Sequence, residues 1–287
     1  MAKVSHLRND NQRDVVKIFL ELSGKYSLWQ LWADFIVMSA IAISNTVDKD
    51  NAPKREEQYM NIVKRYDDYT IQKFPKILAS IVMGMELDPN RDFLGEIYME
   101  LNLGNDAGGQ FFTPYDVCRL MAEINRPADI AQKIEADRFV SVNDCACGAG
   151  ATLIAFANTC KLHDINYQTD VLFTAQDIDF VTACMCYIQL SLLGCPGYVF
   201  VGNSLTNPCV SADKKGLLPL QTENVWFTPM FYSDVWMVRR LFAKMNLLEK
   251  PIETLETEKV EETIISTIEE SLEPELIESK FGQLKLF

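Results

Sequence analysis

The sequence predicts an α/β fold with a parallel sheet, preceded by an all-helical N-terminal domain. Apolar side chains in the first hundred of the 287 residues recur at three- and four-residue spacing, which is typical of helices. From residue 138 onward, short apolar strand-like runs alternate with helical segments, and this alternation indicates parallel strands joined by right-handed crossovers. We expect a helical domain at 1–102, an α/β domain at 103–248 and a tail at 249–287.

The composition is that of a globular protein, with 48% hydrophobic and 23% charged residues. The most apolar run, 28–43, contains Asp34 and is shorter than the roughly 20 residues that span a bilayer. Residues 1–14 do not resemble a signal peptide, so we expect a cytoplasmic protein that does not enter a membrane. Its eight cysteines are expected to be free thiols, with a zinc site as the alternative.

The net charge of −13 at pH 7 is distributed unevenly. Residues 249–287 hold eleven Glu and four Lys, whereas the preceding body carries a net charge of only −6. This body has no basic stripe along its sequence. Independent, tight binding to nucleic acid is therefore not expected.

Helices are expected throughout the first hundred residues. Pro75 and Pro89 separate successive segments, because proline interrupts a helix. The expected helices are 13–21, 28–44, 56–73, 74–85 and 91–101. After a glycine-rich linker, a further helix is expected at 115–124, with Pro114 in its first turn and Thr113 as a candidate N-cap.

Four strands are expected in the rest of the chain, with helices between them. The strands are 138–142, 171–175, 198–201 and 225–227, and the helices are 151–160, 180–193 and 233–248. Ligands of parallel α/β sheets bind beyond the carboxyl ends of the strands. The polar residues at those ends are Asp144, Asp177, Asn203 and Thr228, and we expect all four at one edge of the sheet.

A glycine-containing loop, 143–150, joins the first strand to its helix. Gly148 and Gly150 would let the backbone approach a ligand closely, and the N–H groups at the start of the helix would face that ligand. Asp144 could accept hydrogen bonds from a cationic or hydroxyl-bearing group. Taken alone, the loop fits a simple tight turn equally well.

The residues after the second and third strands suggest a nucleotide-type ligand. Asp177 is placed to accept hydrogen bonds from ribose hydroxyls, Ile178 offers an apolar face to an adenine ring, and Asn203 can bond to the adenine edge. The glycine loop would then face the sugar and an amino-acid portion of the ligand. This combination suggests S-adenosylmethionine.

Four motifs in order resemble those of the adenine-N6 DNA methylases, especially the modification subunits of type I restriction-modification systems. The motifs are 110–114, 144–150, 176–179 and 202–205, and the resemblance covers about 92–231. It implies a class I S-adenosylmethionine-dependent, Rossmann-like methyltransferase sheet that acts on DNA. The residues that it implies for the cofactor are Phe112, Thr113, Asp144, Cys147, Gly148, Gly150, Asp177, Ile178 and Asn203.

The sequence departs from this family at the catalytic motif, which is Asn/Asp-Pro-Pro-aromatic after the fourth strand. The corresponding residues here are Thr228, Pro229 and Phe231. Threonine is a poorer acceptor for the target amine than asparagine, whereas the phenylalanine ring could still stack on an extruded base. The segment 207–209, Asn-Pro-Cys, is a competing candidate, but it follows the third strand so closely that it also fits a turn.

The chain is also shorter than a complete methylase, since the last three strands of the sheet and a target-recognition domain are unaccounted for. We therefore expect an incomplete sheet: either a partner subunit completes the fold and helps the chain to methylate DNA, or the chain is a shortened relative that binds the cofactor without methylating. The leading hypothesis is a methylase or methylase-like subunit of a restriction-modification or mobile-element system. A methyltransferase that acts on RNA or protein shares the cofactor motifs and is the alternative.

The last five residues, Gln-Leu-Lys-Leu-Phe, resemble the short peptide by which bacterial replication and repair proteins bind the sliding clamp. In that mode apolar side chains fill a pocket and the glutamine contacts its rim. The residues concerned are Gln283, Leu284, Leu286 and Phe287. The alternative is that this end packs on its own domain. A second functional hypothesis is thus a catalytically inactive, cofactor-binding interaction protein recruited to the clamp.

Overall fold

The computed structural model describes residues 7, 9–104, 112–221 and 223–249. Contacts within the chain divide it into two units, 1–244 and 245–287, and the fold reported below is that of the first. The acidic tail and the sliding-clamp motif at 283–287 lie outside the described residues. None of the described helices is long and apolar enough to cross a bilayer.

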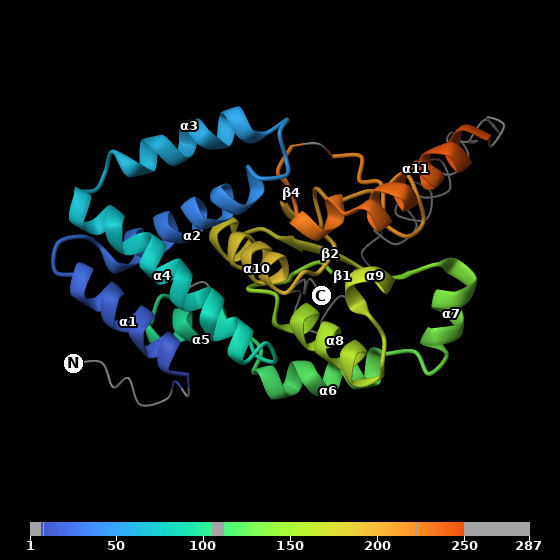
Figure 1. Ribbon diagram of the computed structural model, residues 1–287, viewed down its shortest axis with the longest axis horizontal. Helices are drawn as coiled ribbons and strands as arrows, with labels where there is room; N and C mark the ends of the chain where they lie inside the picture. Colours follow the sequence, from blue (N-terminus) through green and yellow to red (C-terminus); the bar gives the residue numbers. More distant parts are fainter. Residues whose placement is uncertain (1–6, 8, 105–111, 222, 250–287) are drawn as a thin grey trace, which may run out of the picture. The chain divides into compact units, whose positions relative to one another are not determined.

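Five helices form the N-terminal part of this unit (Figure 1). They are α1 (Asp10–Leu22), α2 (Leu28–Ser44), α3 (Ala52–Val63), α4 (Asp68–Leu87) and α5 (Phe93–Glu100). α2 is buried along most of its length, and its Trp32 and Phe35 rings both contact Phe19 of α1. The predicted bounds of α2 are confirmed, because a helix buried on most sides is marked by a nearly continuous apolar run.

The predicted break between the third and fourth helices is wrong. The expected break at Pro75 is replaced by one at 64–67, and Pro75 lies inside α4. Asp67 caps α4, since its carboxylate accepts the Thr70 N–H at 2.9 Å. A good N-cap thus sets the start of the helix, whereas Pro75 removes only the one hydrogen bond that its own N–H would make.

The sheet has four strands in the order β1 (Val140–Asp144), β2 (Val171–Asp177), β3 (Gly197–Val201) and β4 (Val225–Phe227). β1, β2 and β3 are parallel, whereas β4 pairs with β3 in the antiparallel direction. The predicted α/β class with a helical N-terminal part is confirmed. The expectation that every strand is parallel is wrong for β4.

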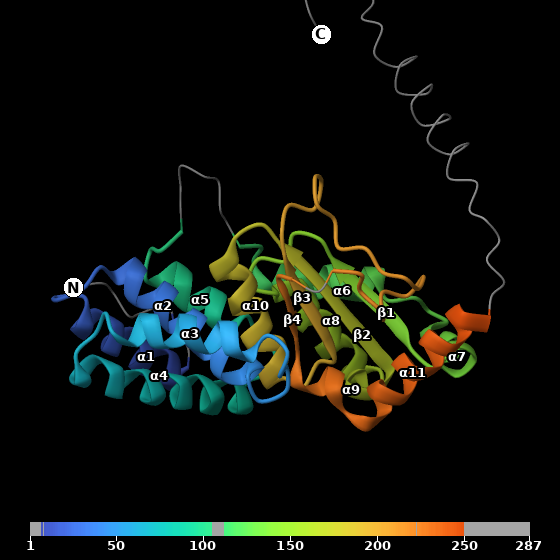
Figure 2. The same cartoon turned by 90° about the horizontal axis from the view of Figure 1, so that it is seen from above.

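Different elements cover the two faces of the sheet. α8 (Ala151–Leu162) and α10 (Phe180–Leu192) pack on one face, and α10 also packs against α2 of the helical part (Figure 2). The other face is covered by residues from the 202–224 connection and by α11 (Asp234–Glu249), including Leu217 and Trp236. Successive residues of β2, Leu172 and Phe173, accordingly belong to different apolar clusters.

The connection between β3 and β4 explains the direction of β4. Residues 202–224 contain no helix among those described, and they turn back on themselves through bonds from Leu220 N–H to Val210 O and from Ala212 N–H to Leu218 O. A parallel return needs a crossover, usually through a helix that spans the sheet. Without one, the chain re-enters the sheet antiparallel to β3.

Two helices precede the sheet in the chain. α6 (Tyr115–Asn125) packs on α8, and α7 (Ile130–Asp137), which the sequence analysis did not identify, leads into β1. α6 begins after Pro114 without a side-chain cap, so the predicted capping role of Thr113 is wrong.

β1 is the edge strand of the sheet, since it pairs with β2 alone among the described strands. A groove of about 510 Å³ runs beside it.

Candidate functional site

The carboxyl ends of β1 and β2 are joined by the glycine loop. The Gly148 N–H donates to Asp177 Oδ2 at 2.7 Å, and the Cys147 N–H donates to the Gln176 carbonyl at 2.9 Å. The other oxygen of Asp177, Oδ1, accepts the Asp179 N–H at 2.9 Å and the Thr182 hydroxyl at 3.3 Å. The predicted convergence of the loop and Asp177 is therefore present in the structure.

Both loop glycines adopt backbone conformations that favour glycine. Gly148 has φ of +52° and Gly150 has φ of +96°, values in the left-handed region. A Cβ atom at Gly150 would also lie 2.9 Å from the Cys186 Sγ, and one at Gly148 would lie 3.3 Å from the Phe112 ring. The loop is thus a close-packed turn under Phe112, in which a side chain at position 150 would clash with Cys186 and one at position 148 would crowd the Phe112 ring.

Asp144 lies at the end of β1 and faces the start of α8. Its Oδ1 accepts the Ala146 N–H at 3.1 Å, and its Oδ2 accepts the Thr152 hydroxyl. Each carboxylate oxygen has two acceptor sites. Asp144 therefore retains acceptor capacity on both oxygens with respect to the described residues.

Asn203 lies beside the same edge, because the Gly202 N–H donates to the Asp177 carbonyl at 2.9 Å. Its side-chain Oδ1 accepts the N–H groups of Leu205 at 2.9 Å and Thr206 at 3.3 Å. These bonds leave the Nδ2 group available as a donor among the described residues. Next to Asp177, the Ile178 side chain is 69% exposed.

Gln176 belongs to the 176–179 motif, but its sequence predicted no role for its side chain. It is buried at the end of β2, where its Nε2 donates to the carbonyls of Gly202 at 3.0 Å and Asn207 at 2.9 Å. Its Oε1 accepts the Cys209 N–H at 2.9 Å. A glutamine at the end of an otherwise apolar strand is the signal that could have identified it, since a buried amide needs several partners.

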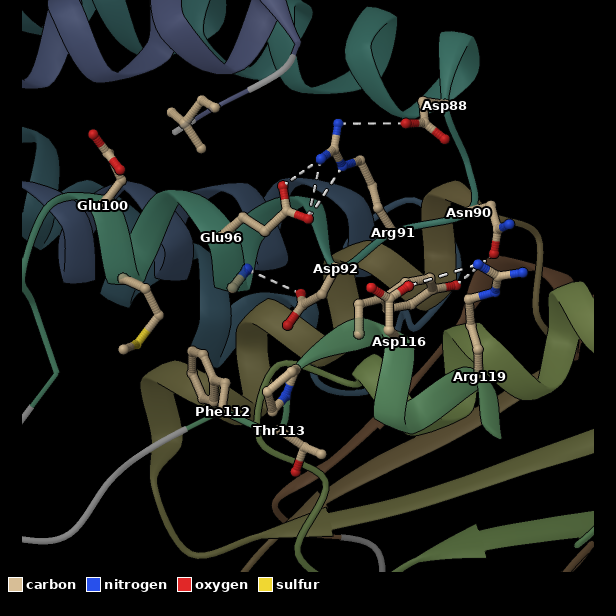
Figure 3. Close-up of a pocket in the computed structure, with 15 residues that line it drawn as sticks. Asp88, Asn90, Arg91, Asp92, Glu96, Glu100, Phe112, Thr113, Asp116 and Arg119 are labelled. Atoms are coloured by element: carbon tan, nitrogen blue, oxygen red, sulfur yellow. Dashed lines mark hydrogen bonds and ion pairs between the residues drawn. The ribbon is translucent and has the colours of Figure 1, made fainter. Parts of the chain in front are cut away.

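The remaining predicted cofactor residues differ in what they present. The ring centroids of Phe112 and Tyr98 lie 5.3 Å apart. Phe112 and Thr113 also border a pocket of about 640 Å³. Figure 3 shows both residues on the opposite side of this pocket from Glu96 of α5. Cys147 is different, because its side chain is buried in the core. A hydrogen bond to the Cys186 thiol, together with burial, raises the pKa of Cys147 well above its ordinary value, so this thiol stays neutral.

The predicted catalytic residues Thr228, Pro229 and Phe231 lie at the opposite end of the sheet from the glycine loop. Because β4 is antiparallel, Thr228 lies beside the start of β3, where its hydroxyl donates to Cys195 O at 2.7 Å and accepts the Gly197 N–H at 3.0 Å. Thr228 is fully buried. Pro229 opens a short 3-10 turn, and Phe231 is buried against the Phe227 ring. None of the three faces the glycine loop.

The competing segment 207–209 lies instead beside the carboxyl ends of β2 and β3, at the edge that holds Asp177 and Asn203. The Asn207 N–H donates to the Asn203 carbonyl at 2.7 Å, and Gln176 holds the backbone on both sides of Pro208. The turn is exposed at Asn207. The segment forms a turn, as its sequence suggested, and this turn lies beside the carboxyl ends of β2 and β3.

The donors and acceptors at this edge fit S-adenosylmethionine. Asp177 Oδ2 has one acceptor site left for a ribose hydroxyl, and Asp144 has sites left for an ammonium group. The exposed Ile178 side chain suits an aromatic base, and Asn203 Nδ2 suits a ring nitrogen of that base. The N–H groups in the first turn of α8 suit a carboxylate.

All eight cysteines are free thiols, and six of them are buried. Among the residues that the structure describes, no group of three or more histidine, cysteine or acidic side chains could hold a metal ion.

More than half of this chain matches a known protein family. The family model described as N-6 DNA Methylase matches residues 89–267. Among solved structures, a Listeria monocytogenes chain provisionally assigned as a class I S-adenosylmethionine-dependent methyltransferase is 16% identical, with a TM-score of 0.36 over 70% of this chain and 56% of its own. A methyltransferase subunit of the type I restriction-modification system of Streptococcus thermophilus is 12% identical, with a TM-score of 0.32 over 71% of this chain and 60% of its own.

This chain therefore spans less than two thirds of the length of either structure. No curated protein matches it at a significant level. The family match covers more than half of the 287 residues and includes Asp144, Asp177 and Asn203. The protein thus belongs to the N-6 DNA methylase family, and this membership implies S-adenosylmethionine as its cofactor.

Proposed function

We propose that this chain is the cofactor-binding subunit of an adenine-N6 DNA methylase of a restriction-modification system, located in the cytoplasm. The observation that carries the proposal is the convergence of Asp144, Gly148, Asp177 and Asn203 on one edge of the sheet. The family match supports the substrate class. None of the comparisons supports the alternative of an inactive protein recruited to the sliding clamp.

The residues at this edge would divide the binding of the cofactor between them. Asp177 would accept a ribose hydroxyl while its other contacts keep the glycine loop in place. Asp144 would hold the ammonium group, and Ile178 and Asn203 would contact the adenine. When bound, S-adenosylmethionine supplies an electrophilic methyl group. The chain itself must then bring an amine close to that methyl group and accept the hydrogen bonds that the amine donates.

We propose Asn207 as the residue that accepts a hydrogen bond from the target amine. Its amide is exposed at the cofactor edge, next to the turn that carries Asn203. Thr228 cannot take this role from the opposite end of the sheet, where its hydroxyl is already bonded to Cys195 and Gly197. An amide oxygen is a good acceptor for an exocyclic amine that has been taken out of the base stack.

We also propose that a partner protein supplies most of the contact with DNA. The body of the chain carries a net charge of −6, and DNA binding depends on neutralising phosphates with lysine and arginine. The sheet also ends at β1, beside an open groove. A partner would add positive charge, and the DNA would reach the cofactor edge through it.

Transfer of labelled methyl groups from S-adenosylmethionine to adenine in DNA tests the proposal, with the chain alone and with cell lysate added. We expect transfer in the presence of lysate, and its loss in Asn207→Ala with cofactor affinity unchanged. Thr206→Ala, a change in the same exposed turn, should transfer normally. Labelled RNA or protein without labelled DNA would reassign the substrate, and no transfer under any condition would contradict a methylase.

A further inference from the structure

A buried glutamine on α10 connects the helical part of the molecule to the glycine loop. Gln189 is 0% exposed, and its Nε2 donates to the Ala149 carbonyl and to Asp92 Oδ1, each at 2.8 Å. Its Oε1 accepts the Leu94 N–H at 3.0 Å. Both amide hydrogens and the amide oxygen are therefore used, and one of the three bonds ends inside the loop that holds the cofactor.

Asp92 fixes the other end of this connection. It is the N-cap of α5, and its Oδ1 accepts the Gly95 N–H at 2.9 Å, a bond drawn in Figure 3. A Cβ at position 95 would lie 2.0 Å from Asp92 Oδ2. Only glycine at this position therefore leaves room for the Asp92 carboxylate to cap α5. Gln189 thus binds to the rigid first turn of α5.

The Ala149 carbonyl is a point where the loop needs an anchor. It lies between two left-handed residues, Gly148 and Gly150, and glycine has more accessible backbone conformations than any other residue. Gly148 is held by Asp177, and the Gly150 N–H is held by the Cys147 carbonyl at 2.8 Å. The bond from Gln189 holds the peptide unit between them.

We propose that Gln189 is a positioning residue for cofactor binding, which fixes the Ala149–Gly150 peptide and thereby the loop that faces the cofactor. The inference rests on the proposed function, since it assumes that this loop binds S-adenosylmethionine. Gln189 is buried behind the loop and does not touch the cofactor. Its effect is exerted through the backbone of the loop.

Gln12 provides an internal comparison. It is also 0% exposed, and its Nε2 donates to the Phe93 carbonyl at 3.1 Å and to Glu96 Oε2 at 2.9 Å. Gln12 therefore joins α1 to α5, and neither of these two bonds reaches the glycine loop. Loss of either glutamine should destabilise the fold, but only loss of Gln189 should loosen the loop.

The experiment compares Gln189→Met with Gln12→Met, since methionine keeps the volume and removes the amide. Cofactor affinity is measured by titration calorimetry at a temperature at which circular dichroism shows each variant folded. We expect the dissociation constant for S-adenosylmethionine to rise at least tenfold in Gln189→Met and to stay within twofold in Gln12→Met. Asp92→Asn, which keeps the Oδ1 acceptor, should also stay within twofold.

A measurement on the unchanged protein covers the case in which Gln189→Met does not fold. We expect the side-chain amide resonances of Gln189 to move when S-adenosylmethionine saturates the protein, while those of Gln12 stay in place. Equal affinities of the two variants, or an unmoved Gln189 signal in the ligand-bound protein, would overturn the inference and leave the proposed function standing. If the unchanged protein binds no cofactor, the proposed function itself fails.

Discussion

The two ends of the sheet use polar residues in opposite ways. At the carboxyl ends of β1 and β2, Asp144 and Asp177 keep acceptor sites that the described residues do not fill. At the other end, Thr228 is fully buried and its hydroxyl both donates and accepts. A polar residue after a strand therefore indicates a site only when the strand ends at the ligand edge and the side chain has capacity to spare.

The largest combined effect is expected for Gly150→Ala. The φ of +96° and the clash with the Cys186 Sγ should together lower stability by roughly 2–4 kcal/mol and raise the cofactor dissociation constant more than tenfold. Chemical denaturation and calorimetry measure both quantities.

Gly194→Ala is the control for this change. Gly194 also has a left-handed φ, +71°, but it lies at the end of α10, away from the loop, and an added Cβ would meet the flexible Gln168 side chain. We expect a stability loss of roughly 1–2 kcal/mol and an unchanged dissociation constant. Equal effects of the two variants on cofactor affinity would mean that the loop has no special role.

Thr228→Val tests the other end of the sheet. The change leaves the Gly197 N–H and the Cys195 carbonyl with fewer partners in a buried place, at a cost of roughly 1–3 kcal/mol. Cofactor affinity and methyl transfer should be unaffected in the folded variant, and Thr228→Ser should restore stability. Loss of methyl transfer in a folded, cofactor-bound Thr228→Val protein would return this residue to the catalytic site.

A pH-dependent effect on stability is expected for Asp92. Burial raises the pKa of Asp92 from an ordinary value of 3.8 to about 6 in the folded protein. The folded state therefore binds more protons than the unfolded state between these values, and the contribution of Asp92 to stability falls as the pH rises through this window. Above pH 6 the loss is at most about 3 kcal/mol.

Asp92→Asn removes the titrating group, so its stability should change less between pH 4 and pH 7 than that of the unchanged protein. Unfolding curves at several pH values measure this difference. Parallel pH dependences of the two proteins would show that Asp92 does not titrate in this window.

Much of the fold follows from local sequence patterns. The bounds of α2 and β4 match those predicted: α2 is a long, nearly continuous apolar run, and β4 is a short run of one β-branched and two aromatic residues. β1 and β2 each extend two residues beyond their predicted ends, to Asp144 and Asp177, and both acidic residues were correctly expected at the carboxyl ends of these strands. These are features that depend on neighbours along the chain.

What sequence reasoning could not supply depends on tertiary contacts. The direction of β4 is decided by the 202–224 connection, whose lack of a helical pattern was the available signal. The contacts of Gln176 and Gln189 join segments 26 to 97 residues apart, and no local pattern reveals such pairs. The position of Thr228 differs from the expected one for the same reason, because an antiparallel β4 ends beside the start of β3.

Binding of S-adenosylmethionine to Asp177→Ala tests the central claim most directly. Asp213→Ala is the matched control, because Asp213 also accepts backbone hydrogen bonds, from Lys215 at 2.9 Å and Leu218 at 2.7 Å. Asp213 lies on the 202–224 connection, which covers the face of the sheet opposite α8 and α10. Calorimetry should show binding to the unchanged protein and to Asp213→Ala, with affinity at least about 100-fold weaker in Asp177→Ala, as expected for loss of roughly 3 kcal/mol. Equal binding to all three proteins, or binding to none, would contradict the assignment of this edge as the cofactor site.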